Sequence, residues 1–96
     1  MKFEWNHRKA VVNLKKHRVS FDEVTTVFSD PLAAIFDDEE HSEIEDREII
    51  VGHSVLSCLL LVCFTERDEQ IIRLFSARLA TKKEREDYEE NAASKI

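Results

Sequence analysis

The stretch from Cys58 to Phe64 constrains the fold more than any other part of the chain, because every residue in it is apolar. A strand with one face in water alternates apolar and polar residues, whereas a strand buried on both faces does not. A membrane-spanning helix needs about 20 apolar residues, so this stretch is too short to cross a bilayer. Residues 58–65 are therefore predicted to form a central strand covered on both faces, and we expect no membrane span.

Three further segments have the composition of strands, namely residues 32–36, 47–52 and 71–77. The connections between them are short, which favours an antiparallel sheet of about four strands. The segment Phe3-Glu4-Trp5 is short and suits an edge strand.

A helix is predicted ahead of these strands. Asn6 is a good N-cap for a helix that runs to about His17. On a helical wheel Ala10, Val11 and Leu14 form its apolar stripe, so we expect this stripe to face the core.

Two capping boxes predict two more helices. Residues 20–23 begin a helix that ends at about Phe28, ahead of a proline, and residues 81–84 begin a C-terminal helix. In the C-terminal helix Tyr88 and Ala92 are the expected docking points. The expected fold is α+β, with two N-terminal helices packed on the sheet and a C-terminal helix, in a single domain of residues 1–96.

Composition excludes several classes of protein. The chain has 96 residues and one glycine, so it cannot form the glycine-rich phosphate loop of a dinucleotide-binding fold. No apolar signal segment follows the N-terminal charge, and we expect a cytoplasmic protein. Cys58 and Cys63 fall on opposite faces of one predicted strand, which predicts reduced thiols.

The distribution of charge is more informative than its total. A net charge of −6 argues against a nucleic-acid-binding protein. However, basic residues dominate segments 2–18 and 67–85, while acids dominate segment 37–48 between them. A fold can gather the two basic segments on one side of the molecule and form a local anion-binding surface.

Two arginines fall within predicted strands, among apolar neighbours. Burying Arg47 or Arg73 is costly unless each is paired with an acid or faces a cleft that binds an anion such as phosphate, and both readings stay open. By strict alternation Arg73 and Arg78 face opposite ways, so they converge only if the chain bends after Phe75. Arginine, lysine, histidine and tyrosine together can cleave RNA without a metal, because they supply the base, the acid and the cations that the reaction needs.

Metal ligation is the weaker reading of the acidic segment. Asp37, Asp38 and His41 could hold a divalent ion in a metal-dependent nuclease, but the histidines lack the spacing of a metal motif. A polar loop explains the same residues.

Many short motifs follow one another in a fixed order from about residue 3 to residue 90. They are Phe3-Glu4-Trp5, Lys9-Ala10, Asn13-Leu14, Lys16-His17, Val19-Ser20-Phe21, Val27-Phe28, Asp30-Pro31, Phe36-Asp37-Asp38, His41-Ser42, Glu45, Arg47, Gly52, Phe64-Thr65-Glu66-Arg67, Ser76-Ala77-Arg78, Ala80, Glu84-Arg85 and Tyr88. In this order and spacing they resemble the BrnT family of toxins from bacterial type II toxin–antitoxin systems.

The resemblance implies a RelE-like fold and a small endoribonuclease that blocks translation with no metal or other cofactor. It also implies a BrnA-like antitoxin that binds the toxin and carries a DNA-binding domain, so that the toxin meets DNA only through its antitoxin.

The resemblance also implies a set of site residues. The catalytic candidates are Lys9, Arg47, Arg73, Arg78 and Tyr88, and the RNA-binding candidates are Lys16, His17, Arg67 and Arg85. The three catalytic arginines would hold the scissile phosphate, and Lys9 or Tyr88 would relay protons. For His17, an interaction with the last carbonyls of the first helix is the alternative role.

The chain departs from the family pattern at several positions. Leu79 stands where a basic residue is frequent, which thins the cationic surface, and Arg18 stands where glycine is usual. The second hypothesis is therefore a catalytically degenerate toxin that serves antitoxin binding and operon control, with the acidic residues 37–48 as its interaction surface.

Overall fold

The computed structural model describes residues 1–41 and 45–94, except for the side chains of residues 92–94. Ser42, one residue of the motif pattern, lies outside the described residues. So does the side chain of Ala92, the second expected docking point.

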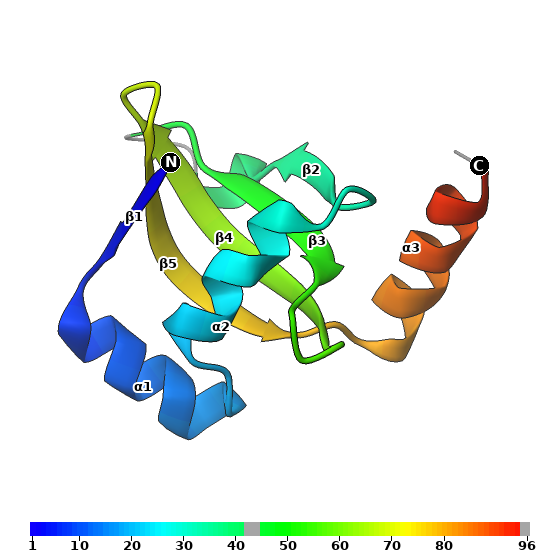
Figure 1. The fold of residues 1–96 in the computed structure, drawn as a ribbon, viewed down its shortest axis with the longest axis horizontal. Coiled ribbons are helices and arrows are strands. Elements are labelled where there is room, and N and C mark those ends of the chain that lie inside the picture. The colour runs from blue at the N-terminus through cyan, green and yellow to red at the C-terminus, as the bar shows by residue number, and fades with distance from the viewer. Residues whose placement is uncertain (42–44, 95–96) are drawn as a thin grey trace.

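A five-stranded mixed sheet forms the centre of the protein, in the order β1-β5-β4-β3-β2 (Figure 1). Its strands are β1 (Lys2–Trp5), β2 (Ala34–Asp37), β3 (Glu48–His53), β4 (Leu59–Arg67) and β5 (Ile71–Leu79). Strands β2 to β5 are antiparallel neighbours, whereas β1 lies parallel to β5. The prediction of about four antiparallel strands is therefore corrected to five strands of mixed direction. The pairing of β1 with β5 joins segments far apart in the chain, and such a pairing leaves no local pattern in the sequence.

The helices are α1 (His7–His17), α2 (Phe21–Thr25) and α3 (Lys82–Ser94), with short 3₁₀ helices η1 (Thr26–Ser29) and η2 (Glu39–His41). Helices α1 and α3 lie at opposite ends of the molecule (Figure 1). The predicted caps are present, because the side chains of Asn6 and Ser20 accept hydrogen bonds from backbone amides in the first turns of α1 and α2. No helix among residues 1–41 and 45–94 is long and apolar enough to cross a membrane.

The main core lies between one sheet face and the layer formed by α2 and η1. Val24, Val27, Leu60, Val62 and Leu74 are all fully buried there. Burial of such side chains is the largest favourable term in the stability of a small domain. This layer covers only one face of the sheet, so the candidate site residues are sought on the other face.

We call the other face of the sheet the open face; it carries Leu61, Cys63, Arg73 and Arg78. At one end α3 covers it, where Val51, Leu59 and Tyr88 form a second apolar cluster. Strand β4 is thus apolar on both faces as predicted.

Helix α1 docks by only part of the predicted face. Ala10 of the predicted stripe packs against the main core, whereas Val11 and Leu14 are 39% and 48% exposed and the buried residue of the helix is Asn13. Asn13 Nδ2 donates to the Val19 carbonyl at 3.1 Å, and its Oδ1 accepts from the Ala77 amide at 3.0 Å. Strand β1 pairs with β5 only as far as Leu74, so this side chain satisfies an amide of the β5 edge. The prediction was wrong for Val11 and Leu14, because the polar side chain of Asn13 directs the docking of the helix.

Candidate functional site

A β-bulge in β5 brings predicted site residues to one face. Cys63 pairs with Ser76, but the next residue of β4, Phe64, pairs with Leu74, so Phe75 has no partner. Leu74 and Ala77 consequently both pack into the main core. Arg73 and Arg78 therefore both lie on the open face, and the bend that their convergence required is present.

The ring of the bulged residue holds two cations. The Arg47 guanidinium carbon lies 3.8 Å from the centroid of the Phe75 ring, and Lys9 Nζ lies 5.3 Å from it. Contacts of this kind contribute about 0.5–2 kcal/mol each. Phe75 therefore joins a lysine of α1 to the arginine that precedes β3.

A basic hollow of about 340 Å³ lies beside this ring. Its lining is Arg8, Lys9, Val12, Asn13, Lys16, His17, Phe75 and Ser76, so none of the acidic side chains that the structure describes is part of it. Arg47 borders this hollow through the Phe75 ring; it also lines a neighbouring hollow with four acidic residues, and its Nη2 lies 3.4 Å from Glu45 Oε1. Arg47 is thus ion-paired, one of the two readings that the sequence left open. We call the basic hollow and the Arg47 side chain the Phe75 site. It brings together four of the predicted residues, namely Lys9, Lys16, His17 and Arg47. His17 lies in the last turn of α1, so its alternative role at the helix end stays compatible with the structure.

Two further arginines share one carboxylate on β1. The Nη1 atoms of Arg67 and Arg73 lie 2.9 Å and 3.5 Å from Glu4 Oε1. Arg73 is thus in an ion pair, one of the two readings that the sequence left open. All three side chains are partly exposed, so these pairs are weak enough for a phosphate to compete with Glu4.

Arg78 is bound at the other end of β5. Its Nη1 and Nη2 atoms donate to the two carboxylate oxygens of Glu84 at 2.7 Å and 2.9 Å. The hydrogen bonds from Arg78 lower the pKa of Glu84 from 4.5 to about 2. Arg73 lies five positions earlier in β5, roughly 16 Å away along the strand, so the two arginines share a face without sharing a partner.

Tyr88 is the buried residue by which α3 packs against the sheet. Its hydroxyl donates to Asp30 Oδ2 at 3.2 Å, and its ring meets His53 edge-on with centroids 5.4 Å apart. Burial and the nearby Asp30 carboxylate raise the pKa of the Tyr88 hydroxyl. The contacts of Tyr88 hold α3 to the end of β3, which confirms the expected docking point.

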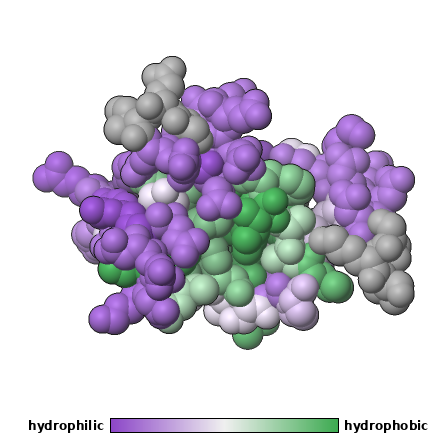
Figure 2. All heavy atoms as spheres, turned by 90° about the horizontal axis from the view of Figure 1, so that it is seen from above, coloured by the Kyte–Doolittle hydropathy of each residue, from purple (hydrophilic) through white to green (hydrophobic). Residues whose placement is uncertain are grey.

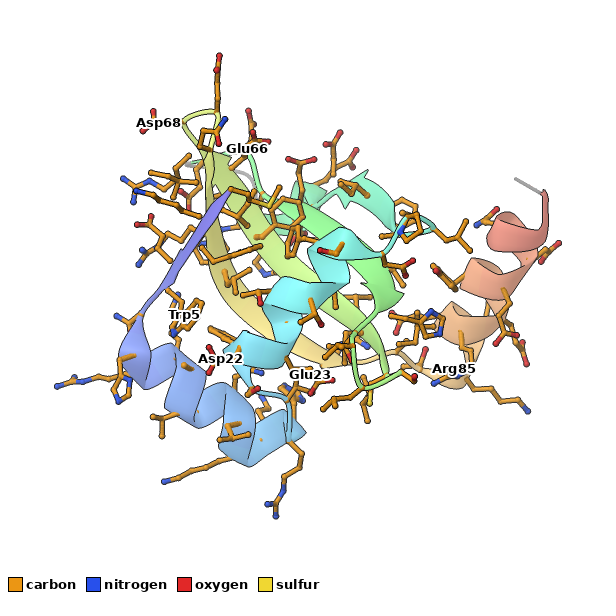
Figure 3. All side chains as sticks on the ribbon, viewed as in Figure 1. Trp5, Asp22, Glu23, Glu66, Asp68 and Arg85 are labelled. Carbon is orange, nitrogen blue, oxygen red and sulfur yellow. The ribbon has the colours of Figure 1, made fainter. Side chains whose placement is uncertain are left out.

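The surface around α3 differs from the Phe75 site. Arg85 is exposed on α3, far from α1 (Figure 3). An apolar groove of about 240 Å³ runs between α3 and strands β2 to β4 and includes Phe36 and Val51. Figure 2 shows an apolar area between the hydrophilic surfaces at the two ends of the molecule.

Sequence reasoning missed two features of the site. Phe75 looked like an ordinary apolar strand residue, and only the bend suggested after it marked the position. Asp38 and His41 form a hydrogen-bonded pair, with His41 Nδ1 3.2 Å and 3.0 Å from the two carboxylate oxygens. From the sequence, Asp38 and His41 suggest metal ligands with Asp37 or a polar loop, and not a hydrogen-bonded pair. Within the described ranges no group of three or more histidine, cysteine, aspartate or glutamate side chains is placed to hold a metal ion.

The fold and the site together define a small α+β protein whose sheet edge and open face gather cations suited to a polyanion. A family model described as "Ribonuclease toxin, BrnT, of type II toxin-antitoxin system" matches residues 5–84. The chain belongs to this family, and it is a ribonuclease toxin whose partner is a protein antitoxin.

A solved structure has the same fold. The crystal structure of the Brucella abortus ribonuclease toxin BrnT superposes with a TM-score of 0.66 at 23% sequence identity. The match covers 85% of this chain and 99% of that chain. A comparison with curated protein sequences finds no match.

Proposed function

We propose that the protein cleaves RNA without a metal ion, at the Phe75 site. The observation that carries this proposal is the pairing of Arg47 and Lys9 on one ring, beside a hollow lined by further cations. Cleavage of an RNA phosphodiester by its own 2′-hydroxyl passes through a transition state with extra negative charge on the phosphate oxygens. A guanidinium fork and an ammonium group stabilise that charge.

The other predicted residues take supporting roles in this proposal. When RNA binds, Arg73 and Arg67 release the Glu4 carboxylate. They then bind the RNA phosphates on either side of the scissile bond. Lys16 and His17 bind RNA along α1. Tyr88 and Arg78 position α3, because their polar atoms already bind Asp30 and Glu84.

Cleavage by the purified chain in the presence and absence of EDTA tests the metal-free mechanism. We expect the same rate in both, and loss of activity in EDTA would contradict the metal-free mechanism.

Arg47→Gln should lower the rate of cleavage about 100-fold or more, since a donor to the transition-state charge contributes about 3–4 kcal/mol. Lys83→Gln removes one positive charge from exposed α3 and is the control, and its rate should equal that of the wild type. An Arg73→Ala/Arg78→Ala variant measures how much the two arginines of the open face contribute to the rate of RNA cleavage.

The antitoxin is proposed to be BrnA-like, with its own DNA-binding domain. Its addition at equal concentration should stop cleavage. A gel shift on operator DNA should need the antitoxin, and DNA binding by the toxin alone would contradict this arrangement.

A catalytically degenerate toxin is the second candidate. It is favoured by carboxylates that already engage four candidate arginines. Glu4 pairs with Arg67 and Arg73, Glu84 with Arg78, and Glu45 with Arg47. A folded chain that binds antitoxin but cleaves no RNA, with or without ribosomes, would support this candidate and overturn the first.

A further inference from the structure

The cations of the Phe75 site stabilise charge, but the reaction also needs a group that moves a proton. Tyr88, a predicted relay, has its hydroxyl bound to Asp30 beneath α3. Lys9 is held against Phe75 as a cation. His17 also lines the hollow, but in this proposal it binds RNA from the last turn of α1. A proton acceptor other than His17 is therefore the component that the site still needs.

We propose that His41 is the proton-transfer residue of RNA cleavage and that Asp38 is its positioning residue. The proposal rests on the ribonuclease function proposed above. The first observation is the contrast in burial within the pair. The His41 side chain is 57% exposed, whereas the Asp38 side chain is 7% exposed. A buried carboxylate thus binds one side of an exposed imidazole ring.

The hydrogen bond orients the imidazole. With Nδ1 bound to the carboxylate of Asp38, the ring presents Nε2 on its opposite side. A carboxylate bound to one ring nitrogen fixes the tautomer in which the other nitrogen accepts a proton, and it stabilises the imidazolium that results. Imidazole is also the side chain best suited to accept and donate protons near neutral pH.

The pair adjoins the Phe75 site through two connections. The Asp38 amide donates to the Arg47 carbonyl at 2.8 Å, so η2 begins beside the residue that carries the guanidinium. On the open face Cys63 Sγ lies 3.8 Å from Asp38 Oδ2, and Cys63 pairs with Ser76, the neighbour of Phe75. Burial raises the pKa of the Cys63 thiol, and the charges of Asp38 and Arg47 both act on this thiol. Asp38 and Arg47 therefore both lie near Cys63.

The step conserves atoms and charge. His41 Nε2 takes the proton of the 2′-hydroxyl, and the 2′-oxygen forms a bond to phosphorus while the bond from phosphorus to the 5′-oxygen breaks. The leaving 5′-oxygen takes a proton from the Lys9 ammonium. The products are a 2′,3′-cyclic phosphate and a 5′-hydroxyl, and solvent exchange returns His41 and Lys9 to their starting states.

Single-turnover cleavage of a short RNA tests the role of His41. His41→Ala should lose about 100-fold or more in rate with little change in RNA affinity, because general base catalysis contributes about 10²–10⁴-fold. Added imidazole should restore part of the lost rate, and a histidine that only maintains local structure would show no such rescue. His53→Ala is the matched control, since His53 also lies beside an aspartate, at 3.8 Å from Asp30, but at the other end of β3.

Asp38→Asn separates positioning from structure. We expect at least a tenfold loss in the rate constant with the KM for RNA unchanged and with no rescue by imidazole. Since Asp38 is buried, the melting temperature of this variant is measured alongside, and the His41→Ala rescue stands independently of it. A wild-type rate in His41→Ala would overturn this inference while leaving the ribonuclease function intact. A wild-type chain with no cleavage would instead overturn the function.

Discussion

Arg18 ends α1 with its backbone in the left-handed region, at a φ of 60°. Side chains other than glycine pay about 1 kcal/mol or more for this conformation, and glycine is the usual residue at such a position. We expect Arg18→Gly to be more stable than Arg18→Ala by about 1 kcal/mol, as measured by urea unfolding. The alanine variant removes the same charge, so the difference reports the backbone alone. Equal stabilities would show that the strain is relieved elsewhere. The position that departs from the family pattern is thus one where the departure has a physical cost.

Glu84 is the residue whose ionisation contributes most visibly to stability. Its pKa is lowered from 4.5 to about 2 by Arg78, so the folded state favours the charged carboxylate. The contribution is present in full above pH 4.5 and is lost as the pH falls toward 2. Glu84→Gln keeps the capping geometry with Thr81 but removes the charge. It should cost about 1 kcal/mol at pH 7, after allowance for solvent screening of a partly exposed pair, and less at pH 3.

The control for this prediction is the exposed pair of Lys83 and Asp87 on the same helix, with side chains 82% and 57% exposed. Asp87→Asn should change the free energy of unfolding by less than about 0.5 kcal/mol at either pH. A cost of Glu84→Gln that did not shrink at pH 3 would show that the pairing with Arg78 is not its source.

At the scale of the element, the docking of α1 on β5 depends on one buried amide. Asn13→Ala would leave the Val19 carbonyl and the Ala77 amide without their side-chain partner. An unsatisfied buried group costs about 1–3 kcal/mol, so we expect a loss of about 3 kcal/mol in urea unfolding. Val12→Ala, at a position 59% exposed on the same helix, should change stability by less than about 0.5 kcal/mol. If the two variants cost the same, α1 is held by other contacts.

The elements that sequence could predict are those with a strong local pattern. The caps at Asn6, Ser20 and Thr81 and the apolar β4 were found in this way. The face by which α1 docks was found only in part, because Asn13 looks like a solvent residue until the free edge of β5 is known. Parallel β1 and the bulge at Phe75 also depend on pairing across the sheet, which no local pattern encodes.

In the candidate site, too, the sequence could identify single residues, but it could not predict which of them the fold brings together. The resemblance supplied Lys9, and the strand pattern together with the resemblance marked Arg47, but only the fold brings the two residues to one ring. Asp38 and His41 are three positions apart and could have been read as a hydrogen-bonded pair, but their burial contrast is a tertiary property.

For the whole molecule, a net charge of −6 coexists with a basic end built from α1. Long-range repulsion from the acidic remainder weakens at physiological salt, where the Debye length is about 8 Å, while close phosphate contacts persist. RNA affinity should therefore fall as salt rises, with a slope of about 0.7 per phosphate neutralised on a single strand.

This slope can locate the path of the RNA across the molecule. Lys9→Gln/Lys16→Gln removes two cations of the Phe75 site and should reduce the slope by about 1.4. Lys82→Gln/Lys83→Gln makes the same change of charge at the start of α3, at the other end of the molecule, and should leave the slope unchanged. Binding measured by fluorescence anisotropy between about 50 and 200 mM salt distinguishes the two. An equal effect of both pairs would mean that RNA responds to the total charge, and the Phe75 site would then not be where the RNA lies.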